Sequence, residues 1–306
     1  MKRYSAAAVL FLSLFCAGCL DSMLFREETS VQNKIRMEMV GSGNKLLAAK
    51  KIQMDRRFKM IDGTEIDTWV VNTSNKTSRG TVVILHGAGE SKSDYLEIGI
   101  NISKRGLDVI LIDLRHHGRS GGKYITCGAK EKEDVSSIVD TLVIEKVIAA
   151  KPIYILGFTF GAATAIQYAA IEDNVSGIVA FAPWKDTVTK TRRDLGLILD
   201  ERDFKKRLAA AGEKAGFDPQ ATSAFNDAAK LKCPVYLIHA MGDLVVPVSD
   251  SEAIFSRLTG PRELKIIIPG PEQIAIGVDW ANWVTKQVDK VIEGNIGSDK
   301  TSTEKK

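Results

Sequence analysis

The chain is poor in the residues that bind metals, with four cysteines and four histidines among its 306 residues. Its Cys-x-x-Cys spacing, Cys16 to Cys19, lies in an N-terminal leader, and the histidines form no rich cluster. We therefore expect no metal site. A phosphate-cradling Gly-x-x-x-x-Gly-Lys sequence is also missing, and we predict no bound cofactor.

The chain also has little net charge and few aromatic residues that could stack on nucleic-acid bases. The net charge is +4, of which Lys2 and Arg3 in the leader supply two, and aromatic residues make up 7% of the chain. This composition predicts no nucleic-acid partner and no strongly acidic partner. The hydrophobic and charged fractions, 44% and 26%, are those of an ordinary globular protein.

The leader combines the basic pair Lys2-Arg3 with an apolar run over residues 6–15. That run is shorter than the roughly 20 residues that a spanning helix needs, which favours a cleaved leader. Cys16-Ala17-Gly18-Cys19 follows and resembles a bacterial lipobox, although Cys16 replaces the usual leucine. The resemblance implies cleavage after residue 18 and lipid attachment, such as palmitate, at Cys19. An ordinary secretory leader is the alternative.

Apolar strands and helical segments alternate through most of the remaining chain. Strands are expected over residues 58–61 and 65–71, joined by Asp62-Gly63, and then over 81–85, 108–113, 152–156, 177–181, 235–239 and 263–268. Helices are expected over 92–104, 130–149, 160–171, 250–258 and 280–292. This order predicts an α/β fold with a mostly parallel, doubly wound sheet.

These patterns divide the chain into four parts, the third of which contains a lid. Residues 1–18 are the predicted lipoprotein signal peptide, 19–50 a polar tether, 51–293 the folded domain, and 294–306 a disordered polar tail. Residues from about 184 to 230 interrupt the alternation and predict a small helical lid. Cys127 and Cys233 fall at opposite edges of the predicted sheet, so we expect two separate thiols.

Four motifs, taken in order, resemble the α/β-hydrolase superfamily, and most closely its lipase, esterase and aminopeptidase-like branch. They are His86-Gly87-Ala88-Gly89-Glu90 after a strand, the Asp113 to Gly122 loop, Gly157-Phe158-Thr159-Phe160-Gly161, and His239 to Pro247. The third has the Gly-x-Ser-x-Gly spacing of a nucleophile elbow, with Thr159 in place of serine.

The resemblance implies a role for each site residue. Thr159 stands at the nucleophile position, Asp243 at the position of the acid, and the N–H groups of Ala88 and Phe160 form the oxyanion hole. Asp243 is alternatively a turn residue. His86 is expected to hold the oxyanion loop by hydrogen bonding.

The expected base is missing. The family's histidine follows the last strand, but here the loop reads Pro269-Gly270-Pro271-Glu272-Gln273, and no histidine follows His239. Gln273 cannot take a proton near neutral pH. Glu272 is a weak base unless it is buried, and His116 is the first candidate for a relocated base.

Two hypotheses follow from this degenerate triad. The first is a lipid-anchored protein of the bacterial cell envelope, on the periplasmic side of the outer membrane, that is catalytically impaired and binds an unknown small ligand or protein partner. The second is an active carboxylic ester hydrolase, similar to serine hydrolases, that uses Thr159 and a relocated base. An enzyme using the oxyanion hole without a covalent intermediate is a third possibility.

Overall fold

The computed structural model describes residues 51–195, 199–268, 280–296 and 300–305. Their strands form a nine-stranded sheet in the order β1-β2-β4-β3-β5-β6-β7-β8-β9. The antiparallel hairpin joins β1 (Met54–Lys59) to β2 (Glu65–Val71), and β2 also runs antiparallel to β4 (Asp108–Ile112). The remaining neighbours are parallel: β3 (Thr81–Leu85), β5 (Ile153–Phe158), β6 (Val175–Phe181), β7 (Val235–Ala240), β8 (Arg262–Ile268) and β9 (Lys300–Lys305).

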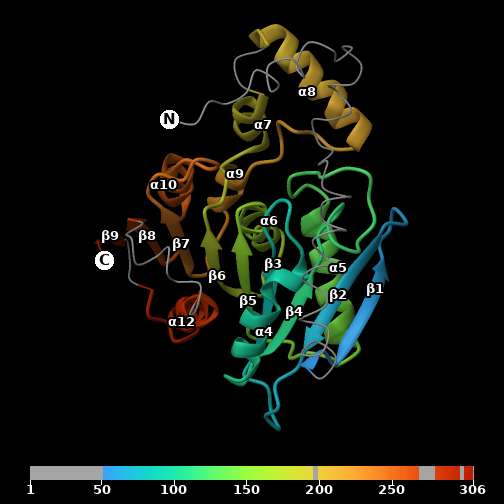
Figure 1. Cartoon of the computed structure of the whole chain (residues 1–306), viewed down its shortest axis with the longest axis vertical. Coiled ribbons are helices and arrows are strands. Elements are labelled where there is room, and N and C mark those ends of the chain that lie inside the picture. The colour runs from blue at the N-terminus through green and yellow to red at the C-terminus, as the bar shows by residue number, and fades with distance from the viewer. Residues whose placement is uncertain (1–50, 196–198, 269–279, 297–299, 306) are drawn as a thin grey trace, which may run out of the picture.

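Each face of the sheet is covered by its own helices, which confirms the predicted α/β fold (Figure 1). One apolar cluster takes in α5 (Glu131–Ile144), α6 (Phe160–Ala169), α9 (Ala224–Ala228) and α10 (Val248–Arg257). The other takes in α4 (Leu96–Ser103) and α12 (Trp280–Ile292). Successive residues of β3 enter opposite clusters, Val82 and Ile84 one, Val83 and Leu85 the other, because strand side chains alternate between faces. A strand buried on both sides is therefore apolar throughout.

The insertion between β6 and β7 contains α7 (Thr187–Leu195), α8 (Glu201–Ala215) and α9, where a lid was expected. In Figure 1 helices α7 and α8 lie at the top, above the strands. Phe204 and Leu208 of α8 pack with Cys127 in a separate small core. Arg193 of α7 donates two hydrogen bonds, of 3.0 and 2.8 Å, to the carboxylate of Asp250 in α10. The insertion is thus attached to the main domain at both sites.

Both described cysteines are free thiols, as predicted. Burial raises the pKa of Cys127 to about 12 and that of Cys233 to about 11. Both thiols are therefore protonated, and weakly nucleophilic, at neutral pH.

The tail differs from its prediction. Residues 294–306 were expected to be disordered, but 300–305 form β9, which pairs in parallel with β8. The sequence Lys300-Thr301-Ser302-Thr303-Glu304-Lys305 has no apolar residue, so its composition indicated no structure. Pairing at a sheet edge requires only backbone N–H and C=O groups, which any such segment supplies.

The leader and the whole tether, including Cys19, lie outside the described residues, as do Glu272 and Gln273. Among the helices that the structure describes, none combines the length and apolar character needed to cross a bilayer. In the same residues no group of three or more His, Cys, Asp or Glu side chains is placed to hold a metal ion.

Candidate functional site

The predicted elbow is present between β5 and α6. Thr159 has φ 43° and ψ −99°, a conformation that costs a non-glycine residue on the order of 1–3 kcal/mol. The glycines on either side allow close packing: a Cβ on Gly157 would lie 2.5 Å from the carbonyl oxygen of Gly161. A Cβ on Gly161 would lie 2.2 Å from the carbonyl oxygen of Leu85. The Gly-x-x-x-Gly spacing is therefore required by backbone contact, whatever the middle residue does.

The oxyanion loop after β3 lies against this elbow. The backbone N–H of Ala88 donates to Thr159 Oγ1 over 3.4 Å. Phe160 is the first residue of α6, and N–H groups of a first helical turn have no acceptor within the helix. Of the two predicted oxyanion donors, the Ala88 N–H is thus bound to the Thr159 hydroxyl, and the Phe160 N–H belongs to the first turn of α6.

Glu90 lies in the oxyanion loop, and the sequence pattern predicts no role for it. Its Oε2 accepts a hydrogen bond of 2.9 Å from Gly87 N–H and another from the hydroxyl of Tyr95. A Cβ placed on Gly87 would lie 2.6 Å from that oxygen and 2.8 Å from Thr159 Oγ1, so the two oxygens lie on the same side of Gly87. Burial, and then the charge of Glu90, raises the pKa of Tyr95, which keeps its hydroxyl a donor. Glu90 fixes the oxyanion loop from within.

His86 performs the structural role expected of it. Its Nδ1 donates to Gly87 O over 2.7 Å, and its Nε2 accepts from Leu114 N–H over 2.9 Å. The tautomer is assigned from these partners, because a carbonyl can only accept. His86 therefore ties the oxyanion loop to the loop after β4. The adjacent His117 is buried, and its Nδ1 bonds to Arg115 O.

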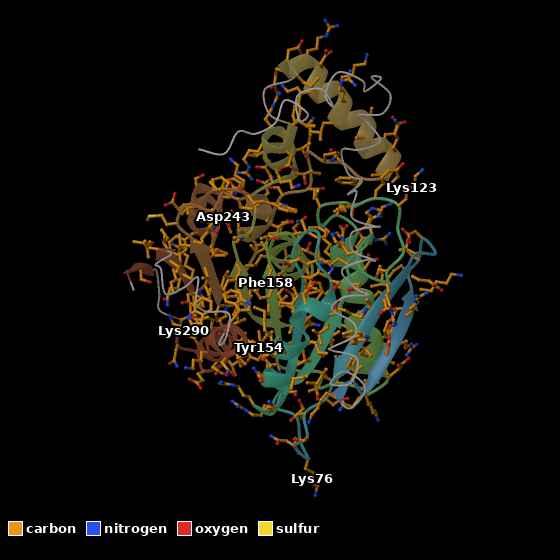
Figure 2. The ribbon with its side chains drawn as sticks, in the orientation of Figure 1. Lys76, Lys123, Tyr154, Phe158, Asp243 and Lys290 are labelled. Atoms are coloured by element: carbon orange, nitrogen blue, oxygen red, sulfur yellow. The ribbon has the colours of Figure 1, made fainter. Side chains whose placement is uncertain are left out.

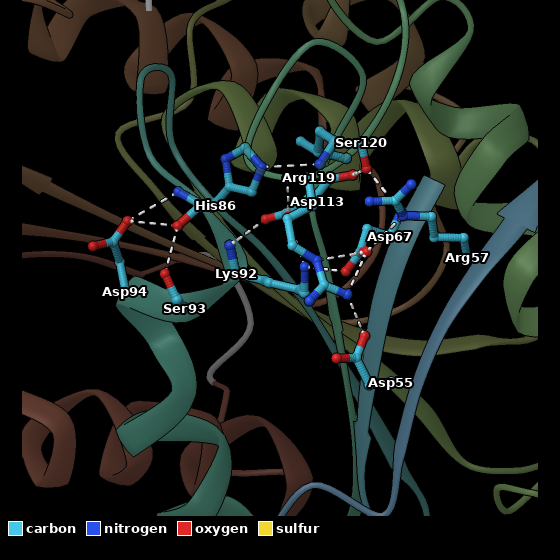
Figure 3. A network of polar contacts seen from close by, with 12 residues as sticks. Asp55, Arg57, Asp67, His86, Lys92, Ser93, Asp94, Asp113, Arg119 and Ser120 are labelled. Atoms are coloured by element: carbon cyan, nitrogen blue, oxygen red, sulfur yellow. Dashed lines mark hydrogen bonds and ion pairs between the residues drawn. The ribbon is translucent and has the colours of Figure 1, made fainter. Parts of the chain in front are cut away.

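Beneath these loops lies a buried ionic network (Figure 3). Lys92, with 1% of its side chain exposed, places Nζ against the carboxylates of both Asp67 and Asp113. Its backbone N–H donates to Asp113 over 2.7 Å. Arg119 donates to Asp67 from Nε over 2.9 Å, and its backbone N–H donates to Asp113 over 2.9 Å.

The opposite charges in this network compensate each other. Burial opposes ionisation of Asp67, but the positive charge and hydrogen bonds of Lys92 and Arg119 outweigh it and lower the pKa of that carboxyl. Asp67 is therefore ionised at neutral pH, and the network anchors the β3 and β4 loops to β2.

Asp243 lies in the loop after β7, at the end of the sheet nearer the lid (Figure 2). Its Oδ1 accepts from the backbone N–H of Val245 over 2.8 Å and of Val246 over 2.9 Å. Its Oδ2 lies 3.8 Å from His239 Nε2. The carboxylate therefore closes a turn, which is the alternative role considered for it. Gln273, the predicted base position, is outside the described residues.

Ser251, His239 and Asp243 lie together and have the residue types of a catalytic triad. Ser251 Oγ donates to His239 Nδ1 over 2.7 Å, and Nε2 donates to Val246 O over 2.8 Å, with Asp243 nearby. Ser251 is 0% and His239 1% exposed, so a substrate has no access to either. This set is a packed structural cluster, as expected for His239.

The four histidines give Thr159 no base in the described part of the chain. There the side-chain hydrogen bond of Thr159 is to Ala88, and none links it to an imidazole. His116, the proposed relocated base, lies in a turn at φ 64° and bonds through Nδ1 to Gly122 O over 3.1 Å. The structure brings the elbow and oxyanion residues together but does not place a histidine on Thr159.

Comparison with known proteins is consistent with this architecture. The family described as serine aminopeptidase, S33, matches residues 76–209, which include the oxyanion loop and the elbow. The uncharacterized protein YqkD of Bacillus subtilis is 29% identical over 61% of this chain and 62% of its own length. A monoacylglycerol lipase of Mycolicibacterium smegmatis is 23% identical over 76% of this chain and 98% of its own.

Among solved structures, the esterase Pf2001 of Pyrococcus furiosus superposes with a TM-score of 0.63. It is 25% identical, and the superposition covers 82% of this chain and 95% of the esterase. The sheet order, the strained elbow and these similarities agree, and the chain belongs to the α/β-hydrolase superfamily.

Proposed function

We propose that this protein is a lipid-anchored component of the bacterial cell envelope whose hydrolase-type site binds a ligand or partner and is catalytically impaired. The observation that carries the proposal is the hydrogen bond from Ala88 N–H to Thr159 Oγ1. In this bond the hydroxyl is the acceptor, so its proton remains to be donated, and in the described residues no hydrogen bond carries that proton to an imidazole.

The usual cost of losing a catalytic triad residue supports the proposal that catalysis is impaired. Losing one triad member typically lowers turnover by about 10⁴ to 10⁶, which leaves about 10³ to 10⁴ over the reaction in water. Thr159 and Gln273 change two of the three positions. The β-methyl of Thr159 also restricts χ1 at a backbone position that is already strained.

The ligand class follows from the retained half of the site. The oxyanion loop and elbow are the parts that bind a polarised carbonyl, and two similar proteins are named as a monoacylglycerol lipase and an esterase. We infer a neutral acyl ester or a related carbonyl compound as the bound group.

Glu90 favours the second candidate, an acyl-ester hydrolase with a relocated base. Its carboxylate is on the same side of Gly87 as the Thr159 hydroxyl. In this hypothesis Glu90 therefore replaces His116 as the candidate base. Two hydrogen bonds, from Gly87 N–H and the Tyr95 hydroxyl, already engage its Oε2.

One assay separates the two candidates. The full chain, Thr159→Ala and Glu90→Gln are each incubated with short-chain aryl esters and with a fluorophosphonate probe. Impairment predicts no turnover and no labelling above that of Thr159→Ala. Activity abolished by Thr159→Ala would establish the hydrolase, and its loss in Glu90→Gln as well would identify the base. A Thr159→Ser/Gln273→His variant should gain activity if only the proton-transfer groups are missing.

The membrane anchor is tested separately. Cys19→Ala should abolish labelling by radioactive palmitate and release the protein from membranes. Unchanged membrane fractionation of this variant would contradict the lipoprotein assignment.

A further inference from the structure

The loop between β7 and α10 exposes three apolar side chains within five residues. Met241 is 47% exposed, Leu244 100% and Val245 75%. Single exposed apolar residues are common on protein surfaces, but a cluster of them marks an interaction site.

This exposure is fixed by the backbone of the loop. The carboxylate of Asp243 accepts from the N–H groups of Val245 and Val246, which sets the turn. Val246 is 1% exposed and its carbonyl accepts from the buried His239, which pins the base of the turn to the core. With its base fixed in this way, the turn holds Leu244 and Val245 outward.

Basic charge lies near the same end of the molecule. Helix α8 carries five basic and three acidic residues, and Arg202, Lys205, Lys206 and Lys214 are exposed. The Arg193–Asp250 pair joins the lid insertion to α10, the helix that follows the exposed loop. Figure 1 shows α7 and α8 at the top of the molecule, with α10 on the left and α8 on the far side of α7 from it.

The tether before the domain is long enough for this surface to reach the membrane. Residues 20–50 can extend over roughly 100 Å, longer than a domain of this size is wide, so the tether by itself allows any face to meet the membrane. An exposed apolar tip with basic residues at the same end of the molecule is a combination that binds an interface with anionic lipid.

We propose that the β7–α10 loop and α8 form a bilayer-facing surface, in which Leu244 and Val245 enter the boundary between headgroups and acyl chains of an anionic membrane. The exposed cations of α8 then face the headgroups. This inference rests on the membrane anchor proposed above, and it orients the elbow end of the sheet toward the lipid.

The test uses the full chain on vesicles of phosphatidylethanolamine and phosphatidylglycerol. An environment-sensitive fluorophore is attached at L244C of the processed, lipidated chain in a Cys233→Ser background. In that chain Cys16 has been removed with the leader, the Cys19 sulfur carries the lipid, and the buried Cys127 resists labelling. The matched control is I144C, because Ile144 is 79% exposed at the end of α5, near the amino ends of the strands. We expect a blue shift and quenching by brominated lipids at position 244 and neither at 144.

The outcomes separate this surface from the anchor. Protein retained on vesicles without a shift at 244 would overturn the surface and leave the anchor standing, whereas protein not retained at all would overturn both. A concentration-dependent shift without vesicles would identify self-association instead. In a Cys19→Ala chain, Leu244→Ser/Val245→Ser should lower vesicle partitioning about tenfold. Equal partitioning of the two chains would contradict the proposal.

Discussion

The elbow half of the site, around Thr159, is enclosed by packed backbone, whereas the acid half, around Asp243, stands on an exposed turn. A Cβ on Gly161 would meet the Leu85 carbonyl at 2.2 Å, while a Cβ on Gly242 has nothing within 4 Å. The elbow half is therefore part of what holds the sheet together. Residues of the acid half can change without loss of the fold, which makes an intact hydrolase fold compatible with missing proton-transfer groups.

Gly161→Ala should have the largest effect of the changes that test this comparison. The new methyl group overlaps backbone that cannot move without separating β3 from α6, so we expect a loss above about 4 kcal/mol and little folded protein. The matched change is Gly242→Ala, which meets only the backbone strain of φ 81°, about 1 kcal/mol. Chemical denaturation measures both. Equal losses would remove the distinction between the two halves.

Lys92→Met should have the next largest effect. It leaves Asp67 and Asp113 buried with less compensating charge, and breaking a buried ion pair costs about 3–5 kcal/mol. Arg57→Gln is the control, because Arg57 also contacts Asp67 but its side chain is 52% exposed. Urea unfolding at neutral pH compares them. A loss for Lys92→Met below that of Arg57→Gln would show that the network does not support the elbow half.

Acid should weaken the same network. The pKa of Asp67 is lowered in the folded protein, so its contribution to stability is complete above its unfolded pKa, about 3.9, and is lost as the pH falls below that value. Urea unfolding in steps from neutral to acidic pH should therefore show a steeper loss for the wild type than for Lys92→Met. Parallel curves would mean that Lys92 does not hold the Asp67 carboxylate in its ionised form.

Asp243→Asn should have the smallest effect. The amide oxygen can still accept from Val245 and Val246, so stability should change by less than about 1 kcal/mol. Asp243→Ala, which removes both bonds, should cost more. Any ester turnover should be equal in the wild type and Asp243→Asn if the residue only closes a turn. A hundredfold fall in turnover would show that it orients a working base.

Much of the fold was predictable from local pattern. Fully apolar runs such as residues 81–85 predicted strands buried on both faces, and Asp62-Gly63 predicted the hairpin. The structural role of His86 was predictable because His86 opens the motif that resembles the oxyanion loop of α/β-hydrolases. Glu90 was missed because a glutamate three residues after Gly87 becomes a site residue only when the loop folds back and directs its carboxylate inward.

Other features depend on groups that are distant in the chain. A lysine is usually exposed, yet Lys92 is buried because Asp67 in β2 and Asp113 just after β4 both contact its ammonium group. The polar tail forms β9 because β8 offers an edge.

The sequence by itself determined the order of strands and helices, the elbow spacing and the absence of a histidine after residue 239, since these follow from local periodicity and residue identity. Only the tertiary structure decided that Thr159 accepts from Ala88, that Asp243 closes a turn, and that Leu244 and Val245 face outward. Hydrogen bonding and exposure depend on which atoms the fold brings within a few ångströms of each other, and neighbours in the chain do not specify that.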